Sequence, residues 1–234
     1  MQLSVVLHQP MYEGNVGSVA RAMKNFGFHE LVLVKPCRLK EFSRAMASHA
    51  QDLLAEARIA PSLDDALSGA DLVVGTTGKR IGEGQRHLRL HLRVPCLTPK
   101  ELAERLAPWE GKVAILFGPE DCGLSNDELM DCDLVVSIPT SDGYPVMNLS
   151  HAAAILLYEL SGIGPGEVKM ADGGSLDRLY ARYREWLCSI DYPTHKIEYT
   201  MLMLRRIYGR SGLTEREVNT ILGALKKAEW SKRR

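Results

Sequence analysis

Three short segments of the chain combine glycines with polar side chains in the spacing of ligand-binding loops. The first segment, residues 14–23 (GNVGSVARAM), has a GxxG spacing followed by Arg21. A glycine turn that leads into a helix suits an anion, because free N–H groups and the helix dipole point at the turn. The spacing differs from the GxGxxG of dinucleotide sites, so tight packing between a strand and a helix is the alternative interpretation.

The second and third segments carry acidic and amide side chains. Residues 117–125 (FGPEDCGLS) place two acidic residues between glycines after an apolar run, and open α/β sheets bind ligands outside the carboxyl ends of their strands. A turn that ends in a Ser125 cap is the alternative. Residues 138–151 (IPTSDGYPVMNLSH) form a mixed apolar and amide loop suited to a flat ring. We interpret His151 as a packing or capping residue rather than a base.

Short runs of Val, Ile and Leu predict the strands that must position these segments. The predicted strands are Leu3–Leu7, Leu31–Val34, Leu72–Gly75, Val113–Phe117 and Leu134–Ile138. Such nearly continuous apolar runs are typical of parallel strands that are covered on both faces. A hydroxyl three positions before a carboxylate, at Ser62, Thr98 and Ser125, predicts helix starts between the strands. The predicted fold class is therefore α/β, a parallel sheet with helices on both faces.

A glycine-rich stretch separates this part from a helical end of the chain. Residues 163–174 predict a linker, so a sheet domain covers residues 1–162 and a helical extension covers residues 175–234. Helices are expected over residues 176–188, 196–208 and 214–230. Their apolar stripe predicts packing between helices or against a dimer partner. The stripe consists of Leu202, Leu204, Ile207, Leu213, Val218, Ile221, Leu222 and Leu225.

Composition excludes several classes of protein. The chain has 234 residues, of which 45% are hydrophobic and 25% charged, as in globular rather than disordered proteins. It lacks an apolar run of the ~18–20 residues that a membrane helix needs, and its start does not resemble a signal peptide, so we expect a cytoplasmic protein. Its five cysteines include no CxxC pair, which argues against a zinc site or a disulfide framework.

Positive charge is concentrated in two regions. Lys79, Arg80, Arg86 and Arg89 follow the predicted strand Leu72–Gly75 and suit contacts with a phosphate backbone, with a solvated loop as the alternative. Residues 166–234 contain 14 Lys and Arg against 9 Asp and Glu. This excess predicts a nucleic-acid surface or an ionic dimer contact. The residues expected to form such a second RNA surface are Arg205, Arg206, Arg210, Lys226 and Lys227.

In their order and spacing, the three segments resemble the three motifs of the SPOUT superfamily of RNA methyltransferases. The chain most resembles the TrmJ-type tRNA 2′-O-ribose methyltransferases, and its IPTS…YPVMN segment is similar to archaeal members. The resemblance implies a trefoil knot at the end of the sheet domain and S-adenosylmethionine as the cofactor, without a metal. It also implies a homodimer with each active site near the subunit interface, and methylation of tRNA at nucleotide 32 of the anticodon loop.

The resemblance further assigns site residues. It implies catalytic roles for Arg21, Asn15 and Glu120. Cofactor contacts are implied at Thr76, Thr77, Gly78, Gly118, Glu120, Ile138, Val146, Met147 and Asn148. An arginine loses its proton only near pH ~12.5–13.8, so a neutral form at pH 7 costs roughly 7–9 kcal/mol. We therefore expect Arg21 to orient the ribose 2′-oxygen or a phosphate as a cation rather than to act as the base.

Two departures from bacterial members and three alternative functions remain. Pro145 and Val146 stand where bacterial members carry a serine pair, and Lys79, Arg80 and Ile81 stand where they carry an arginine pair.

The alternative functions are the same chemistry at another tRNA nucleotide or in rRNA, a non-catalytic RNA-binding protein, and a nicotinamide-dependent oxidoreductase. The last lacks the third glycine of its motif. The motifs do not distinguish cytidine from uridine at the target.

Overall fold

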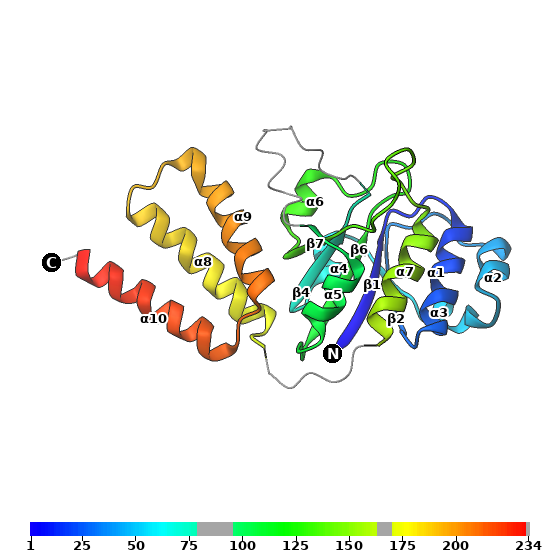
Figure 1. Cartoon of the computed structure of the whole chain (residues 1–234), viewed down its shortest axis with the longest axis horizontal. Coiled ribbons are helices and arrows are strands. Elements are labelled where there is room, and N and C mark those ends of the chain that lie inside the picture. Colours follow the sequence, from blue (N-terminus) through cyan, green and yellow to red (C-terminus); the bar gives the residue numbers. More distant parts are fainter. Residues whose placement is uncertain (79–95, 163–169, 233–234) are drawn as a thin grey trace.

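A computed structural model describes residues 1–78, 96–162 and 170–232 of the chain. Its amino-terminal part is a seven-stranded sheet in the order β3-β2-β1-β6-β4-β7-β5, and all neighbouring strands are parallel. The strands are β1 (Gln2–His8), β2 (Glu30–Val34), β3 (Arg58–Ala60), β4 (Leu72–Thr76), β5 (Cys96–Leu97), β6 (Lys112–Phe117) and β7 (Leu134–Val136). Figure 1 shows this sheet with its covering helices and, beside it, a separate group of helices.

The helices of the sheet part precede those of the extension along the chain. The former are α1 (Glu13–Asn25), α2 (Glu41–Ala47), the 3-10 turn η1 (Ser48–Ala50), α3 (Gln51–Ala55), α4 (Leu63–Leu67), α5 (Pro99–Leu106), α6 (Asn126–Met130) and α7 (Leu149–Ser161). The latter are α8 (Gly173–Ser189), α9 (Thr194–Ser211) and α10 (Glu215–Lys232).

Alternate side chains of each strand enter two separate cores, because successive residues of a strand point to opposite faces. Leu3, Val5 and Leu7 of β1 pack with α1, α5 and α7 on one face. Val6 of the same strand packs with residues of α4 and α6 on the other face. The sheet is therefore covered on both sides, and the predicted α/β class with helices on both faces is confirmed.

Four predicted strands are confirmed almost to the residue, as β1, β2, β4 and β6. The fifth, β7, ends at Val136 instead of Ile138. Ile138 is followed by Pro139, which has no N–H group with which to extend the ladder. The sequence did not predict the edge strands β3 and β5, because three and two residues are too short to show periodicity.

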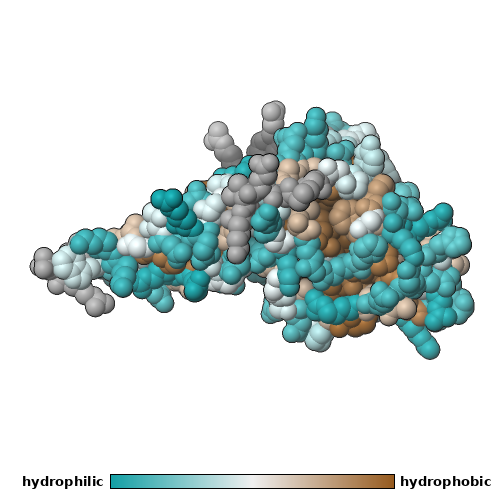
Figure 2. Space-filling view, turned by 90° about the horizontal axis from the view of Figure 1, so that it is seen from below, coloured by the Kyte–Doolittle hydropathy of each residue, from teal (hydrophilic) through white to brown (hydrophobic). Residues whose placement is uncertain are grey.

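The order of the strands brings the three segments together. Strands β1, β6, β4 and β7 are consecutive neighbours in the sheet. Because parallel strands end at the same edge, the loops after them meet there. Figure 2 views the molecule from below, which is the side where the chain and β1 begin, and shows a hydrophobic area over the sheet part. The meeting loops lie at the opposite edge of the sheet.

Helices α8, α9 and α10 share a core of their own, in which Leu179 and Val218 are fully buried. Most of the predicted apolar stripe packs into this core, although Ile207 is 43% exposed. The last helix also begins with a capping interaction, since Glu217 accepts hydrogen bonds from the N–H and the hydroxyl of Thr214.

Two arginines of helix α9 contact the sheet part. Arg205 Nη1 lies 3.2 Å from Oδ1 of the buried Asp133, whose Oδ2 accepts a 2.8 Å hydrogen bond from the N–H of Val73. Arg206 is 4% exposed and donates to the carbonyl of Leu129. Burial raises the pKa of Asp133, while the Arg205 guanidinium acts to lower it. Arg205 and Arg206 thus face the protein, and the expectation that they add to an RNA surface is wrong.

Close backbone contacts complete this junction. A Cβ atom on Gly209 of α9 would lie 2.6 Å from the carbonyl oxygen of Asp133, so only glycine allows the approach. The N–H of Gly173 donates to Oδ1 of Asp71, and a Cβ at Gly173 would lie 2.6 Å from the carbonyl oxygen of Ala70. The trefoil knot and the division into residues 1–162, 163–174 and 175–234 stay predictions.

A helix that spans a bilayer must be both long and apolar. Within residues 1–78, 96–162 and 170–232, no helix is both long and apolar enough to cross a membrane.

Candidate active site

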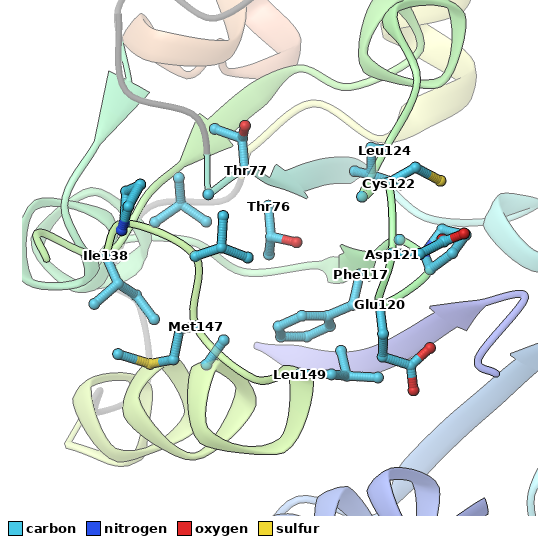
Figure 3. A pocket seen from close by; sticks show the side chains of 18 of the residues that line it. Thr76, Thr77, Phe117, Glu120, Asp121, Cys122, Leu124, Ile138, Met147 and Leu149 are labelled. Atoms are coloured by element: carbon cyan, nitrogen blue, oxygen red, sulfur yellow. The ribbon is translucent and has the colours of Figure 1, made fainter. Parts of the chain in front are cut away.

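A cavity lies where the loops after β4, β6 and β7 meet the start of α7. Figure 3 shows Ile138 and Met147 on one side of it and Asp121 and Cys122 of the β6–α6 loop on another. The lining residues are Thr76, Thr77, Gly78, Phe117, Gly118, Pro119, Glu120, Asp121, Cys122, Gly123, Leu124, Val136, Ile138, Thr140, Pro145, Val146, Met147, Leu149, Ala152 and Leu156. Apolar residues thus form much of the wall, and Glu120 and Asp121 bring carboxylates to it.

The β6–α6 loop folds back tightly on itself at the mouth of the cavity. The N–H of Gly123 donates to the carbonyl of Pro119, and Gly123 has a φ of +66°, a conformation that favours glycine. A Cβ atom on Gly118 would lie 2.4 Å from the nitrogen of Leu124. The loop then enters α6 through a capping box between Ser125 and Glu128. Both glycines are therefore required by the shape of this wall.

Glu120 connects this loop to the start of α1. Its Oε2 accepts a 2.7 Å hydrogen bond from the N–H of Met11, and its Oε1 accepts from the N–H of Tyr12 and from Nδ2 of Asn15. The first N–H groups of a helix lack intrahelical partners and favour a negative charge nearby. The Glu120 carboxylate therefore holds the first and second segments together.

Asn15 also makes a hydrogen bond to the third segment. Its Oδ1 accepts a 3.1 Å hydrogen bond from Nδ2 of Asn148. Asn148 is the N-cap of α7, and its Oδ1 accepts from the N–H and the hydroxyl of Ser150. A chain of hydrogen bonds from Glu120 through Asn15 to Asn148 therefore joins all three segments.

The structure brings together most of the residues that sequence analysis assigned to a cofactor. Eight of them line the cavity: Thr76, Thr77, Gly78, Gly118, Glu120, Ile138, Val146 and Met147. Asn148 lines a neighbouring cleft instead. The hydroxyl of Thr76 donates to the carbonyl of Leu116, so this side chain is engaged within the sheet. The binding roles of all nine residues stay predictions.

The first segment is arranged differently from the expected glycine turn. Helix α1 begins at Glu13, so Gly14 and Gly17 lie inside it. A Cβ on Gly17 would lie 2.1 Å from the carbonyl oxygen of Ser43, and one on Gly14 would meet Phe42. The GxxG spacing thus serves the packing of α1 against α2, and the hypothesis of an anion-binding glycine turn is wrong.

Arg21 stands apart from the cavity. It is exposed on α1, six residues after Asn15 and hence about 9 Å further along the helix axis. Arg21 lines neither the cavity nor the neighbouring cleft. The structure therefore brings Asn15 and Glu120 together but leaves Arg21 outside the site of its own chain.

The remaining site predictions concern His151 and the basic loop. His151 is exposed and lines the neighbouring cleft, and Asn148 rather than His151 caps α7, so its interpretation as a packing or capping residue is wrong. Lys79, Arg80, Arg86 and Arg89 lie outside the described residues. Among the described residues, no group of three or more His, Cys, Asp or Glu is placed to hold a metal ion.

Cys122 is the one described cysteine that lines the cavity. Its hydrogen bond with the Asp121 side chain raises the pKa of its thiol. A raised pKa disfavours the thiolate, which is the reactive form of a cysteine.

Several lining residues were missed by sequence analysis. Leu149, Ala152 and Leu156 form one apolar face of α7 at the spacing i, i+3, i+7, a signal that was present in the sequence. Tyr12 and Tyr144 line the neighbouring cleft, and nothing in their local sequence marks them.

The part of the chain that contains the sheet and the cavity matches the model of a known protein family. The model of the SpoU rRNA Methylase family matches residues 2–158, a range that contains every strand of the sheet and all lining residues of the cavity. The chain belongs to this family. The resemblance inferred from the three segments is thereby confirmed.

Individual relatives of this SpoU family member match nearly its whole length. The tRNA (cytidine-2′-O-)-methyltransferase TrmJ of Methanocaldococcus jannaschii is 38% identical over 234 residues, which cover 97% of this chain and 99% of the relative. The tRNA (cytidine/uridine-2′-O-)-methyltransferase TrmJ of Pectobacterium atrosepticum is 34% identical over 239 residues, or 95% of each chain. The crystal structure of TrmJ from Z. mobilis superposes with a TM-score of 0.74 at 27% identity, covering 98% of this chain and 100% of that one.

Proposed function

We propose that this SpoU family member transfers a methyl group from S-adenosylmethionine to a ribose 2′-hydroxyl of tRNA. The observation that carries the proposal is the match over 97% of the chain to a tRNA 2′-O-methyltransferase. The cavity supports it, because the three segments that surround or flank it are held in one place by Glu120, Asn15 and Asn148.

The cavity fits the cofactor in shape and in chemistry. The missing side chain of Gly118 leaves room beside Leu124, and Ile138, Met147 and Leu149 offer an apolar bed for an adenine ring. The carboxylates of Glu120 and Asp121 suit a positively charged ligand. When bound, S-adenosylmethionine supplies a methyl group on a positively charged sulfur.

The residues of the chain divide into holding and orienting roles. Glu120 and Asn15 hold the loops on the two sides of the site, and Arg21 orients the 2′-oxygen or a neighbouring phosphate as a cation. Because Arg21 lies outside the cavity of its own chain, its target is the site of a second copy in a homodimer. Lys79, Arg80, Arg86 and Arg89 bind the RNA backbone.

The target is nucleotide 32 of the anticodon loop, and the enzyme acts in the cytoplasm without a metal. The test is methyl transfer from labelled S-adenosylmethionine to unmodified tRNA transcripts, followed by mapping of the label. Label on the ribose of nucleotide 32 supports the whole proposal. Label on another ribose keeps the chemistry and overturns the position, and bound cofactor without transfer to any tRNA or rRNA points to an RNA-binding protein.

We expect Arg21→Lys to lose most of the transfer activity, because the planar guanidinium binds two oxygens at once and an ammonium does not. Cofactor affinity, measured by calorimetry, stays unchanged in this variant. Arg44→Lys, an exposed arginine on α2, serves as the matched control. Near-native turnover of Arg21→Lys would contradict the orienting role.

A further inference from the structure

A second cleft opens directly beside the cavity. The two share Glu120, Thr140 and residues 145–147 and 149, so this stretch of the β7–α7 loop forms a common wall. A group bound in the cleft therefore lies next to a group bound in the cavity. The cleft is the place from which a substrate can approach a methyl donor.

Two exposed tyrosine rings border this cleft. Tyr12 is 61% exposed and Tyr144 is 82% exposed. Within the described residues, neither ring packs on another aromatic ring and neither hydroxyl makes a hydrogen bond. Large rings that stay in water next to a binding site are suited to a flat partner that covers them.

The polar groups of the cleft identify the kind of partner. Asn15 and Asn148 supply amides, and the described residues that line the cleft include no lysine or arginine. These described residues offer a phosphate backbone no lysine or arginine, and among them Glu120 contributes a negative charge. Aromatic rings together with amides are the groups that bind an unstacked base of single-stranded RNA.

We propose that Tyr12 and Tyr144 hold the base of the target nucleotide after it has left the stack of its RNA loop. The inference rests on the proposed function, because it places that base beside the methyl donor. Extrusion is required since a stacked nucleotide does not reach a recessed cavity. Stacking tolerates any base, so the two rings support cytidine and uridine alike.

The test compares ring removal with ring retention in the full-length protein. Tyr12→Ala and Tyr144→Ala remove the rings, and Tyr12→Phe and Tyr144→Phe keep them. Tyr158→Ala is the matched control, because Tyr158 is 63% exposed and lines neither the cavity nor the cleft. For each variant, KM for unmodified tRNA transcripts, kcat, cofactor affinity by calorimetry and mass by light scattering are measured.

We expect each alanine variant to raise KM for tRNA about tenfold for cytidine and uridine targets alike, and each phenylalanine variant to restore it. Cofactor affinity and mass stay unchanged. An unchanged KM in both alanine variants overturns the inference, and so does a change of mass, which assigns the rings to a subunit contact. A wild-type protein that transfers no methyl group to RNA refutes the proposed function instead. The methyl transfer of the wild-type protein is therefore measured before any variant is compared.

Discussion

At the scale of single residues, Glu120 joins two of the three segments of the site through its hydrogen bonds. One carboxylate accepts hydrogen bonds from Met11, Tyr12 and Asn15, which lie more than 100 positions earlier in the chain. A charged acceptor makes stronger hydrogen bonds than a neutral one. The negative charge of Glu120 thus positions the start of α1 relative to the β6–α6 loop.

Glu120→Gln should lower the free energy of unfolding by about 1–3 kcal/mol, because an amide turns one N–H donor toward groups that are themselves donors. We also expect weaker cofactor binding, since the loop loses its anchor. Chemical denaturation and calorimetry measure the two effects. Glu110→Gln, an exposed glutamate elsewhere, should change neither quantity. Wild-type stability in Glu120→Gln would refute the positioning role.

Gly118→Ala should destabilise the protein by about 1–3 kcal/mol and reduce cofactor affinity. The added methyl would lie 2.4 Å from the nitrogen of Leu124, so the loop must move into or away from the cavity. Gly162→Ala is the control, because a Cβ there meets nothing within 4 Å. Unaltered cofactor binding in Gly118→Ala would mean that the loop shape is irrelevant to the site.

At the scale of elements, α1 links the site to the outer helices. Its glycines allow α2 to approach closely, and its Glu13 carboxylate accepts hydrogen bonds from the N–H groups of Lys40 and Ser43 at the start of α2. The hydrogen bond from Lys40 is the main cause of a lowered pKa of Glu13. The same helix that presents Asn15 to the cleft beside the cavity therefore also caps its neighbour.

The lowered pKa of Glu13 predicts a pH dependence. A carboxyl whose pKa is lower in the folded state stabilises the fold above its ordinary value of 4.5, and this contribution disappears as the pH falls through the folded value. Glu13→Gln should therefore lower Tm at pH 7, and its Tm difference from the wild type should be smaller at an acidic pH below 4.5. Glu104→Gln, an exposed glutamate on α5, is the control. An equal Tm difference at both pH values would contradict the assignment.

At the scale of the whole molecule, the helical extension is docked onto the sheet part by buried polar contacts. Arg205 contacts Asp133 at the start of β7, and Arg206 contacts the end of α6. These two elements lead to and from loops that line the cavity. The extension thus contacts the sheet part where β7 begins, and the site lies at the other end of the strands.

Asp133→Ala should lower the free energy of unfolding by about 3–5 kcal/mol, because it leaves Arg205 without its carboxylate and the N–H of Val73 without an acceptor. Denaturation curves measure the loss, and a double-mutant cycle with Arg205→Ala isolates the pair. Arg216→Ala, an exposed arginine on α10, should have little effect. A coupling energy near zero would show that the pair does not hold the junction.

Local features of this protein follow from the sequence alone. The caps at Ser62, Thr98 and Ser125 and the strands β1, β2, β4 and β6 depend on neighbours within a few residues, so their patterns are visible in the chain. The three segments were also recognisable, because a family resemblance depends on motifs and their order.

Contacts between distant residues were decided by the tertiary structure. Periodicity does not encode the order of strands in a sheet, and that order brings Glu120 to Asn15 and Asn15 to Asn148. For the same reason, the sequence did not distinguish glycines that pack α1 on α2 from a ligand-binding turn. It also did not distinguish a buried Arg206 from a basic RNA surface, because burial depends on which helix face meets the sheet.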